Sequence, residues 1–303
     1  MKKLVMFFLL AFMVSCSSED ATVDSVNSQS NESTLQNGIL TFKDEKSFIG
    51  EYSKLSKMNP SELQKWISAK KVNSLLNTSN DSLVMQEEIL SDSRIIYSDA
   101  MKAILNSESK FRVNGKLLWL NEGNFYELTD NDSSKTISEL KIVQSELKVY
   151  GKILSFSNKQ EGKANLTSRV IVPNENRVRT YVNNGPNDKR YILELFNETI
   201  AMNNSIVSTK MFLKSIMQYK SCSFWRCTYK EDTSNTRSME IQLSHNWRNQ
   251  LGSNFTGGYR GSYTLLLADF SVEGPVIPTN FSVTGFVRTR VNGYTWDQAV
   301  TWY

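Results

Sequence analysis

The chain has 303 residues, of which 35 are basic, 31 are acidic and 40% are apolar, so it can build packed cores and favours two domains of ordinary size. A zinc site is not expected, because the chain has one histidine and lacks a second cysteine pair beside Cys222 and Cys227, and no motif requires a cofactor. The lysines and arginines form no dense run, which argues against a nucleic-acid partner.

The first 15 residues have the layout of a bacterial signal peptide. Two lysines precede an unbroken apolar run over residues 4–14, which is too short to cross a bilayer core, because that needs roughly 20 helical residues. The run ends at Ser15-Cys16, which resembles the lipobox of bacterial lipoproteins, although Met13 replaces the usual leucine. The resemblance implies that Cys16 becomes a lipidated N-terminus; a signal peptide without lipidation is the alternative.

Residues 16–37 are expected to form a disordered tether. The tract is rich in Ser, Asn, Thr, Gln and Asp and has few apolar side chains that could offset the entropy of ordering. Cys16 is followed by two serines, Glu19 and Asp20, which resembles the export signal of surface lipoproteins in Bacteroidetes. That resemblance implies an outer-membrane protein displayed on the cell surface. The periplasmic face of the membrane is the alternative.

Residues 38–130 are expected to form a mainly helical module that includes a hairpin. A short strand over 39–42 leads to Asp44, which is typical of a helix N-cap. Asn59 followed by proline predicts a second helix start, and apolar spacing predicts helix over 82–105.

A β-hairpin is expected at Asn114-Gly115, because both residues tolerate a positive φ. A third strand is expected over 125–128. The order of a phenylalanine-bearing strand, a helix, a Met-Asn-Pro turn and a helical tryptophan resembles uncharacterised Bacteroidetes lipoproteins over residues 16–105. This resemblance carries no catalytic motif.

Residues 131–303 are expected to form an antiparallel β-sandwich, immunoglobulin-like or related, which makes the whole chain α+β. Residues 134–150 fit either helix or strand, and strand-like alternation begins near residue 152. A two-residue turn at Asn292-Gly293 would pair the last two strands with one apolar face and one polar face. Such a strand pair is typical of a sandwich.

Two cysteines and two aromatic residues are the candidate site residues of this C-terminal part. Cys222 and Cys227 would meet an oxidising compartment, and the four residues between them could form a hairpin loop that lets them bridge. Trp225 lies within that loop and Tyr259 follows a Gly-Gly turn, so both are candidates for binding a ligand. Local packing is the alternative for each.

Catalytic chemistry finds little support in the sequence. His245 shares strand parity with apolar residues, which favours a structural role. Glu194 and Glu198 share one strand face, as would Asp269 and Glu273, but four residues separate their backbones by about 13 Å. Glycoside hydrolysis needs carboxyl groups about 5–9.5 Å apart, so only carboxylates from different strands could serve.

The sequence therefore favours a non-catalytic binding protein, attached to the membrane by its N-terminal lipid, with a glycan or protein ligand. A structural subunit of an envelope or pilus-like assembly is the second hypothesis. A glycoside hydrolase-like enzyme is the third.

Overall fold

The computed structural model describes residues 33–78, 96–154, 178–224, 226–245, 255–271 and 282–302. They belong to one unit that spans Asn31–Tyr303. The signal peptide, Cys16 and most of the predicted tether lie outside the described residues. Of the helices in the described ranges, none has the length and apolar character needed to span a bilayer.

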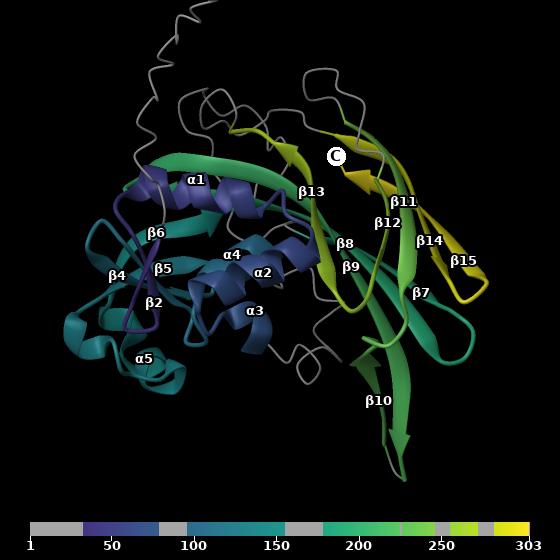
Figure 1. Ribbon diagram of the computed structural model, residues 1–303, viewed down its shortest axis with the longest axis horizontal. Helices are drawn as coiled ribbons and strands as arrows, with labels where there is room; N and C mark the ends of the chain where they lie inside the picture. The colour runs from purple at the N-terminus through teal and green to yellow at the C-terminus, as the bar shows by residue number, and fades with distance from the viewer. Residues whose placement is uncertain are drawn as a thin grey trace, which may run out of the picture. The chain divides into compact units, whose positions relative to one another are not determined.

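The described chain has a first part that contains the helices, followed by a second part made of strands (Figure 1). The helices are α1 (Glu45–Leu55), α2 (Pro60–Lys70), α3 (Leu75–Thr78), α4 (Asp99–Ile104) and α5 (Ile137–Val143), with short 3-10 turns η2 (Asp130–Asp132) and η3 (Gln144–Glu146). The strands of the first part are β1 (Thr34–Gln36), β2 (Ile39–Phe42), β3 (Lys110–Val113), β4 (Lys116–Asn121), β5 (Asn124–Leu128) and β6 (Lys148–Leu154). The later strands are β7 (Val178–Asn184), β8 (Lys189–Met202), β9 (Ser205–Ser223), β10 (Arg226–Glu231), β11 (Arg237–His245), β12 (Phe255–Tyr259), β13 (Tyr263–Asp269), β14 (Val283–Val291) and β15 (Tyr294–Trp302).

The described strands form two sheets. The larger sheet has 11 strands in the order β1-β2-β3-β4-β5-β6-β8-β9-β10, with β7 paired to β8 and β13 paired to β9. The smaller sheet has the order β12-β11-β14-β15. Only the β2–β3 pair is parallel among these pairings, because α1 to α4 connect those two strands. The larger sheet therefore crosses residue 130, where the sequence suggests a division between two modules.

Strands β8 and β9 join the two parts of the molecule because both are long and both are buried on two faces. They have 14 and 19 residues, and every residue from Tyr191 to Met202 is buried. One face of β8 contributes Leu193 and Leu195 to a core shared with the smaller sheet, while the other face contributes Phe196 to a core shared with the helices. A strand buried on both faces loses the alternation of apolar and polar residues that reveals a half-buried strand.

The first core lies between the helices and the larger sheet. It contains Phe48 and Tyr52 from α1, Trp66 from α2, Met101 from α4 and Phe196 from β8. The helices that supply these residues begin at strong caps, in which each cap side chain accepts a backbone N–H three residues along. The N-caps predicted at Asp44 and Asn59 are confirmed.

The second core lies between the larger sheet and the smaller one. It contains Tyr191 and Met217 from the larger sheet and Ile241, Val287 and Trp296 from the smaller sheet. The last hairpin has the predicted register, since Val291 lies opposite Tyr294 across the Asn292-Gly293 turn. Local turn chemistry was sufficient to predict this pairing.

A β-rich α+β fold is thus confirmed, while two finer predictions are not. The helices α1 to α4 share a core with β8 and β9, so the structure does not set them apart as a helical module. An immunoglobulin-like strand order is not confirmed either. Of the helix predicted over 82–105, residues 99–104 form α4, residues 96–98 are not helical, and positions 79–95 lie outside the described residues. The ambiguous stretch 134–150 contains α5, η3 and the start of β6.

Candidate functional site

The end of β9 and the strand β10 form a hairpin that extends away from the other labelled strands in Figure 1. We call residues 218–231 the β9–β10 hairpin. Its register places Ser223 opposite Arg226 and Cys222 opposite Cys227. β10 ends the strand order of the larger sheet, so within the described residues the hairpin has a sheet neighbour on one side only.

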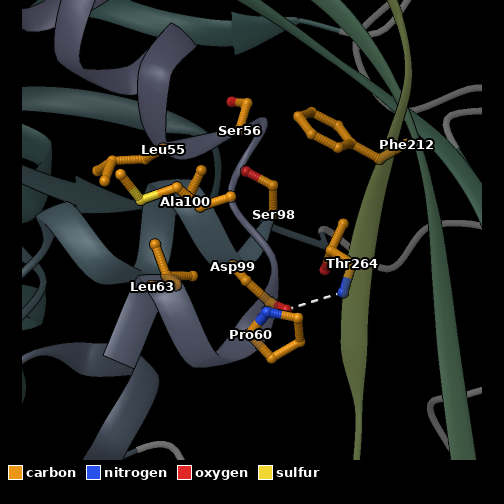
Figure 2. Close-up of a pocket in the computed structure, with 10 residues that line it drawn as sticks. Leu55, Ser56, Pro60, Leu63, Ser98, Asp99, Ala100, Phe212 and Thr264 are labelled. Carbon is orange, nitrogen blue, oxygen red and sulfur yellow. Dashed lines mark hydrogen bonds between the residues drawn. The ribbon is translucent and has the colours of Figure 1, made fainter. Parts of the chain in front are cut away.

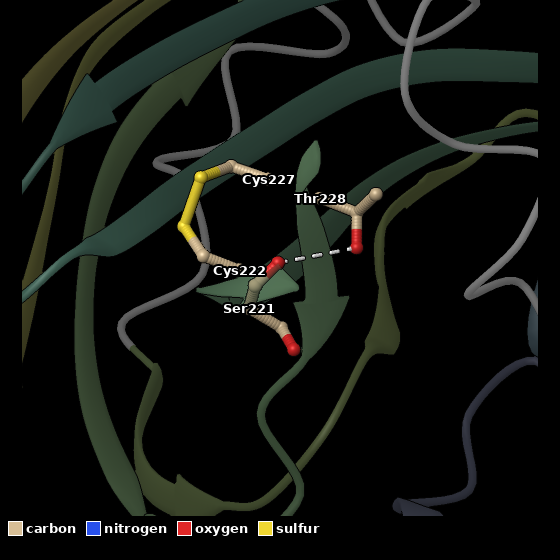
Figure 3. Close-up of a disulfide and its surroundings, with 4 residues drawn as sticks. All are labelled: Ser221, Cys222, Cys227 and Thr228. Atoms are coloured by element: carbon tan, nitrogen blue, oxygen red, sulfur yellow. Dashed lines mark hydrogen bonds between the residues drawn. A yellow bond between two sulfur atoms is a disulfide. The ribbon is translucent and has the colours of Figure 1, made fainter. Parts of the chain in front are cut away.

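The tip of this hairpin is closed by a disulfide. Cys222 and Cys227 are joined with an S–S distance of 2.06 Å (Figure 3). Beside them, the hydroxyl of Thr228 donates to the carbonyl of Ser221 at 3.5 Å. A crosslink between directly opposed strand residues holds the two strand ends together and restricts the loop between them. The tip loop is therefore presented in fewer conformations than an open hairpin would allow.

Phe224 occupies the tip loop and is 92% exposed. Among the described residues, one other large apolar side chain is comparably exposed, Ile142 on α5 at 81%. Sequence reasoning selected its neighbour Trp225, which lies outside the described residues, and missed Phe224. The signal was available, because both aromatic residues lie between the two cysteines.

Each face of the β9–β10 hairpin pairs a tyrosine with cations. On one face, the guanidinium of Arg190 lies 3.8 Å from the ring centroid of Tyr229 and its N–H groups donate to Gln218 Oε1 at 2.8 and 2.5 Å. Lys220 lies directly opposite Tyr229 in the register. Opposed residues of an antiparallel pair share a face. Arg190, Tyr229 and Lys220 therefore form one cation–aromatic group.

The other face repeats this arrangement with different residues. Lys230 lies directly opposite Tyr219, which is 38% exposed, and Lys189 Nζ lies 5.6 Å from the Tyr219 ring centroid. Lys189 also pairs with Asp232. Burial raises the pKa of Asp232, but hydrogen bonds from Lys189, Ser234 and Asn235 outweigh it and lower that pKa below its ordinary value. The carboxylate of Asp232 is therefore ionised at neutral pH, and its negative charge is balanced by Lys189.

Tyr259, the other predicted binding residue, lies at the end of β12 rather than in a turn. It is half-buried and packs edge-to-face on Tyr263, with ring centroids 4.8 Å apart. It also packs against the second core. These contacts supply the packing role considered above, and a ligand role for Tyr259 stays a prediction.

A second unusual region lies beneath the helices, where β8, β9 and β13 carry charged side chains into the interior. We call Glu194, Glu198, Lys210, Lys214 and Asp269 the buried charged seam. Glu194 lies opposite Lys214 and Glu198 lies opposite Lys210 in the β8–β9 register, and Asp269 of β13 pairs with Lys210. Glu194, Glu198 and Lys210 are fully buried.

Glu198 ties this seam to the helices. Its carboxylate accepts from the Tyr52 hydroxyl at 2.5 Å, from the Ser98 backbone N–H at 2.5 Å and from the Ser98 hydroxyl at 2.7 Å. Burial, together with the negative charge of Glu198, raises the pKa of Tyr52 well above its ordinary value, so the phenol stays protonated and donates. Three donors to one buried carboxylate are the pattern of a structural clamp.

The space beside this clamp is small. Figure 2 shows Ser98 and Asp99 facing Phe212 and Thr264 across a pocket of about 10 Å³, which is room for about one water molecule. Asp99 accepts the Thr264 backbone N–H at 2.8 Å. Burial raises the pKa of Asp99, although Lys102 and Lys214 partly oppose that rise. The pocket is too small for a sugar ring.

The sequence-predicted catalytic candidates fall into this same region or outside the described residues. Glu194 and Glu198 share one strand face, as expected from their spacing, and Glu273 lies outside the described residues. His245 ends β11, and burial lowers its pKa, so it is neutral at neutral pH. Across the described ranges, no cluster of His, Cys, Asp and Glu side chains could hold a metal ion.

Comparisons with known proteins show no family for this chain. No family model matches it, and no curated protein matches it. Among solved structures, a crystal structure of a DUF4848 family protein from Bacteroides thetaiotaomicron aligns with 89% of this chain and 100% of its own, at 13% identity and a TM-score of 0.21. A TM-score this low supports no conclusion about fold or function.

Proposed function

We propose that this chain is a lipid-anchored protein of the outer membrane, displayed on the cell surface, that binds a glycan or protein ligand without transforming it. The contact is made by the tip of the β9–β10 hairpin, held out by a β-sandwich formed by the two sheets around the second core. The observation that carries the proposal is the 92% exposure of Phe224 at a disulfide-closed tip.

The exposed Phe224 side chain gains hydrophobic free energy only when a ligand covers it. Burying a phenylalanine contributes about 1.5–3 kcal/mol, and Phe224 leaves nearly all of that unrealised in the protein alone. Aromatic rings in contact sites bury a large area and lose little conformational entropy, since they have two rotatable side-chain bonds. The disulfide adds to this by restricting the loop before a ligand arrives.

The test uses full-length protein in neutral detergent, a panel of neutral and acidic polysaccharides, and collagen, laminin and mucin. Phe224→Ser is expected to weaken binding to whichever probe binds by about tenfold, which corresponds to about 1.4 kcal/mol. Ile142→Ser is the matched control, because it removes an equally exposed apolar side chain from α5. Thermal unfolding of both variants shows whether they are folded.

Two results would contradict the proposal. Equal losses in Phe224→Ser and Ile142→Ser would mean that the tip is not the contact. No binding to any probe would remove the main support for a binding role, and recovery of the protein from native membranes in large complexes would then favour an assembly subunit.

The anchor has its own test. Cys16→Ala is expected to abolish incorporation of a labelled fatty acid and to release the protein from the membrane fraction, because the acyl chains supply the attachment. Protease treatment of intact cells should remove the wild-type protein if it is displayed outside. Full protection in intact cells would place it on the periplasmic face, and retention of Cys16→Ala in the membrane would contradict the lipid anchor.

A further inference from the structure

Three cations lie near one another on the β9–β10 hairpin and the adjoining start of β8, namely Lys220, Lys230 and Arg190. Lys220 and Lys230 are both exposed, and within the described ranges neither forms an ion pair. Arg190 is held by the amide of Gln218 and by the ring of Tyr229, which are both neutral partners. The hairpin and the start of β8 therefore present three cations together, with Arg190 and Lys220 on one face and Lys230 on the other.

Two acidic side chains follow β10 or end it, and one of them is in an ion pair. Glu231 accepts the backbone N–H of Ser262, and Asp232 pairs with Lys189. The charge of the surrounding sequence has the same sign, since residues 131–303 contain 21 basic and 14 acidic residues. An anionic ligand would thus meet a positive potential at the hairpin and along the approach to it.

Tyrosines stand between these cations on both faces. Tyr229 lies between Arg190 and Lys220, and Tyr219 lies opposite Lys230. Aromatic rings offer flat apolar faces to sugar rings, while lysine and arginine donate charge-assisted hydrogen bonds to carboxylate and sulfate groups. On each face a tyrosine and a lysine lie side by side across the ribbon, so a ring face and an anionic group of an acidic polysaccharide can be met together.

The spacing along the ribbon favours an extended ligand over a membrane surface. Lys220 lies four residues from Phe224, and Lys230 lies opposite Tyr219, five residues from Phe224, so the two lysines are about 13 and 17 Å from the tip along the strands. A bilayer touched by the tip alone would lie beyond the Debye length of about 8 Å from both lysines, so their charge would be screened. A polymer that passes around the outer edge of β10 reaches the tip and the lysine on each face.

We propose that the β9–β10 hairpin binds an acidic polysaccharide, with Phe224 at the tip and Lys220, Lys230 and Arg190 pairing with its carboxylate or sulfate groups. This inference rests on the proposed binding function and specifies its ligand class.

The test measures binding of full-length protein in neutral detergent to heparin, hyaluronan and dextran, and to vesicles of phosphatidylcholine with phosphatidylglycerol. The variant Lys220→Gln/Lys230→Gln is compared with Lys65→Gln/Lys141→Gln, which removes the same charge from exposed positions on α2 and α5. We expect the hairpin variant to bind an acidic polysaccharide about tenfold more weakly and the control to change less than about twofold.

Heparin and hyaluronan distinguish sulfate from carboxylate recognition, and binding to either one supports the inference. Raising the salt concentration should weaken that binding, because the lysines are exposed. Equal losses in the two lysine variants would overturn the inference, since the effect would then come from net charge alone.

Failure of the inference can be told apart from failure of the binding function. If dextran or a matrix protein binds, and binding depends on Phe224 but not on the lysines, the ligand class is wrong and the binding function stands. Vesicle binding that depends on Phe224, without binding to heparin or hyaluronan, would also overturn the ligand class. If no probe binds, the binding function itself loses its support.

Discussion

The buried charged seam and the tip of the β9–β10 hairpin depart from the usual placement of side chains in opposite directions. The seam carries charged groups such as Glu198 and Lys210 into the interior, where burial is costly unless each group is paired. The tip carries Phe224 out into water. Because Glu198 has three donors and lies beside a pocket of one-water size, we assign the seam to stability. We propose that the tip serves recognition.

The comparison is tested most strongly at Glu198. Glu198→Ala would leave the buried Tyr52 and Ser98 hydroxyls without their charged acceptor, and Lys210 would keep Asp269 but lose a second nearby carboxylate. The free energy of unfolding should therefore fall by about 3–5 kcal/mol in urea denaturation. Asp297→Asn, which removes an exposed partner of Arg288, should cause a far smaller loss.

Glu198→Gln provides the second arm of that experiment, because its amide oxygen can still accept a hydrogen bond from Tyr52 or Ser98. Its stability should lie between those of the wild type and Glu198→Ala. If the Glu198→Gln protein folds but no longer binds the ligand, the contrast between the two regions is wrong, because the buried charged seam would then take part in binding.

A smaller effect is expected at the disulfide. Cys222→Ser/Cys227→Ser opens a six-residue loop, whose closure is worth about 2 kcal/mol in the chain-entropy model. Because the bridge lies at the end of a hairpin, that loss should be local. Amide hydrogen exchange should quicken over residues 218–231 while the thermal midpoint stays within a few degrees.

Binding should also weaken in this variant, by about three- to tenfold. Without the bridge the loop must become ordered when the ligand binds, whereas the disulfide orders it beforehand. Unchanged exchange at the tip, or a collapse of the whole protein, would show that the bridge does not act by restricting the loop.

The smallest effect is expected at Asp99, and its sign depends on pH. Burial raises the pKa of this carboxyl, so the folded protein holds the proton more tightly than the unfolded chain does. Its contribution to stability is therefore complete below the ordinary carboxyl value and declines as the pH rises through the raised pKa.

Asp99→Asn keeps an acceptor for the Thr264 N–H and removes that decline. At pH 7 the variant should be slightly more stable than the wild type, and at pH 3 equally stable. Asp99→Ala lacks the acceptor and should be less stable at both values. A less stable Asp99→Asn at pH 7 would mean that the charged form is favoured, contrary to the direction of the pKa shift.

The two regions also differ in how far sequence could predict them. The Asn292-Gly293 hairpin and the caps at Asp44 and Asn59 follow from signals within a few residues, and the structure has them as expected. The Glu198 clamp could not be predicted, because Tyr52 lies 146 positions away and Ser98 lies 100 positions away. Such partners become visible only when the strand pairing is known.

The hairpin tip was partly predictable, less so than the helix caps and more so than the Glu198 clamp. Its cysteines and aromatic residues are adjacent in sequence, which is why a loop at 222–227 was expected. The pairing of Lys220 with Tyr229 and of Lys230 with Tyr219 depends on the register, and the sequence left that register open. Exposure of Phe224 depends on how far the hairpin extends from the sheet, which no local pattern encodes.

Hydroxyl-radical footprinting tests the central claim most directly, because it detects contact without a substitution. Full-length protein would be oxidised alone and with the polysaccharide or protein that binds most tightly in the panel. The account predicts that oxidation of Phe224, Tyr219 and Tyr229 falls on binding while Ile142 is oxidised as before. Protection of Ile142, or protection that leaves the β9–β10 hairpin unchanged, would contradict it.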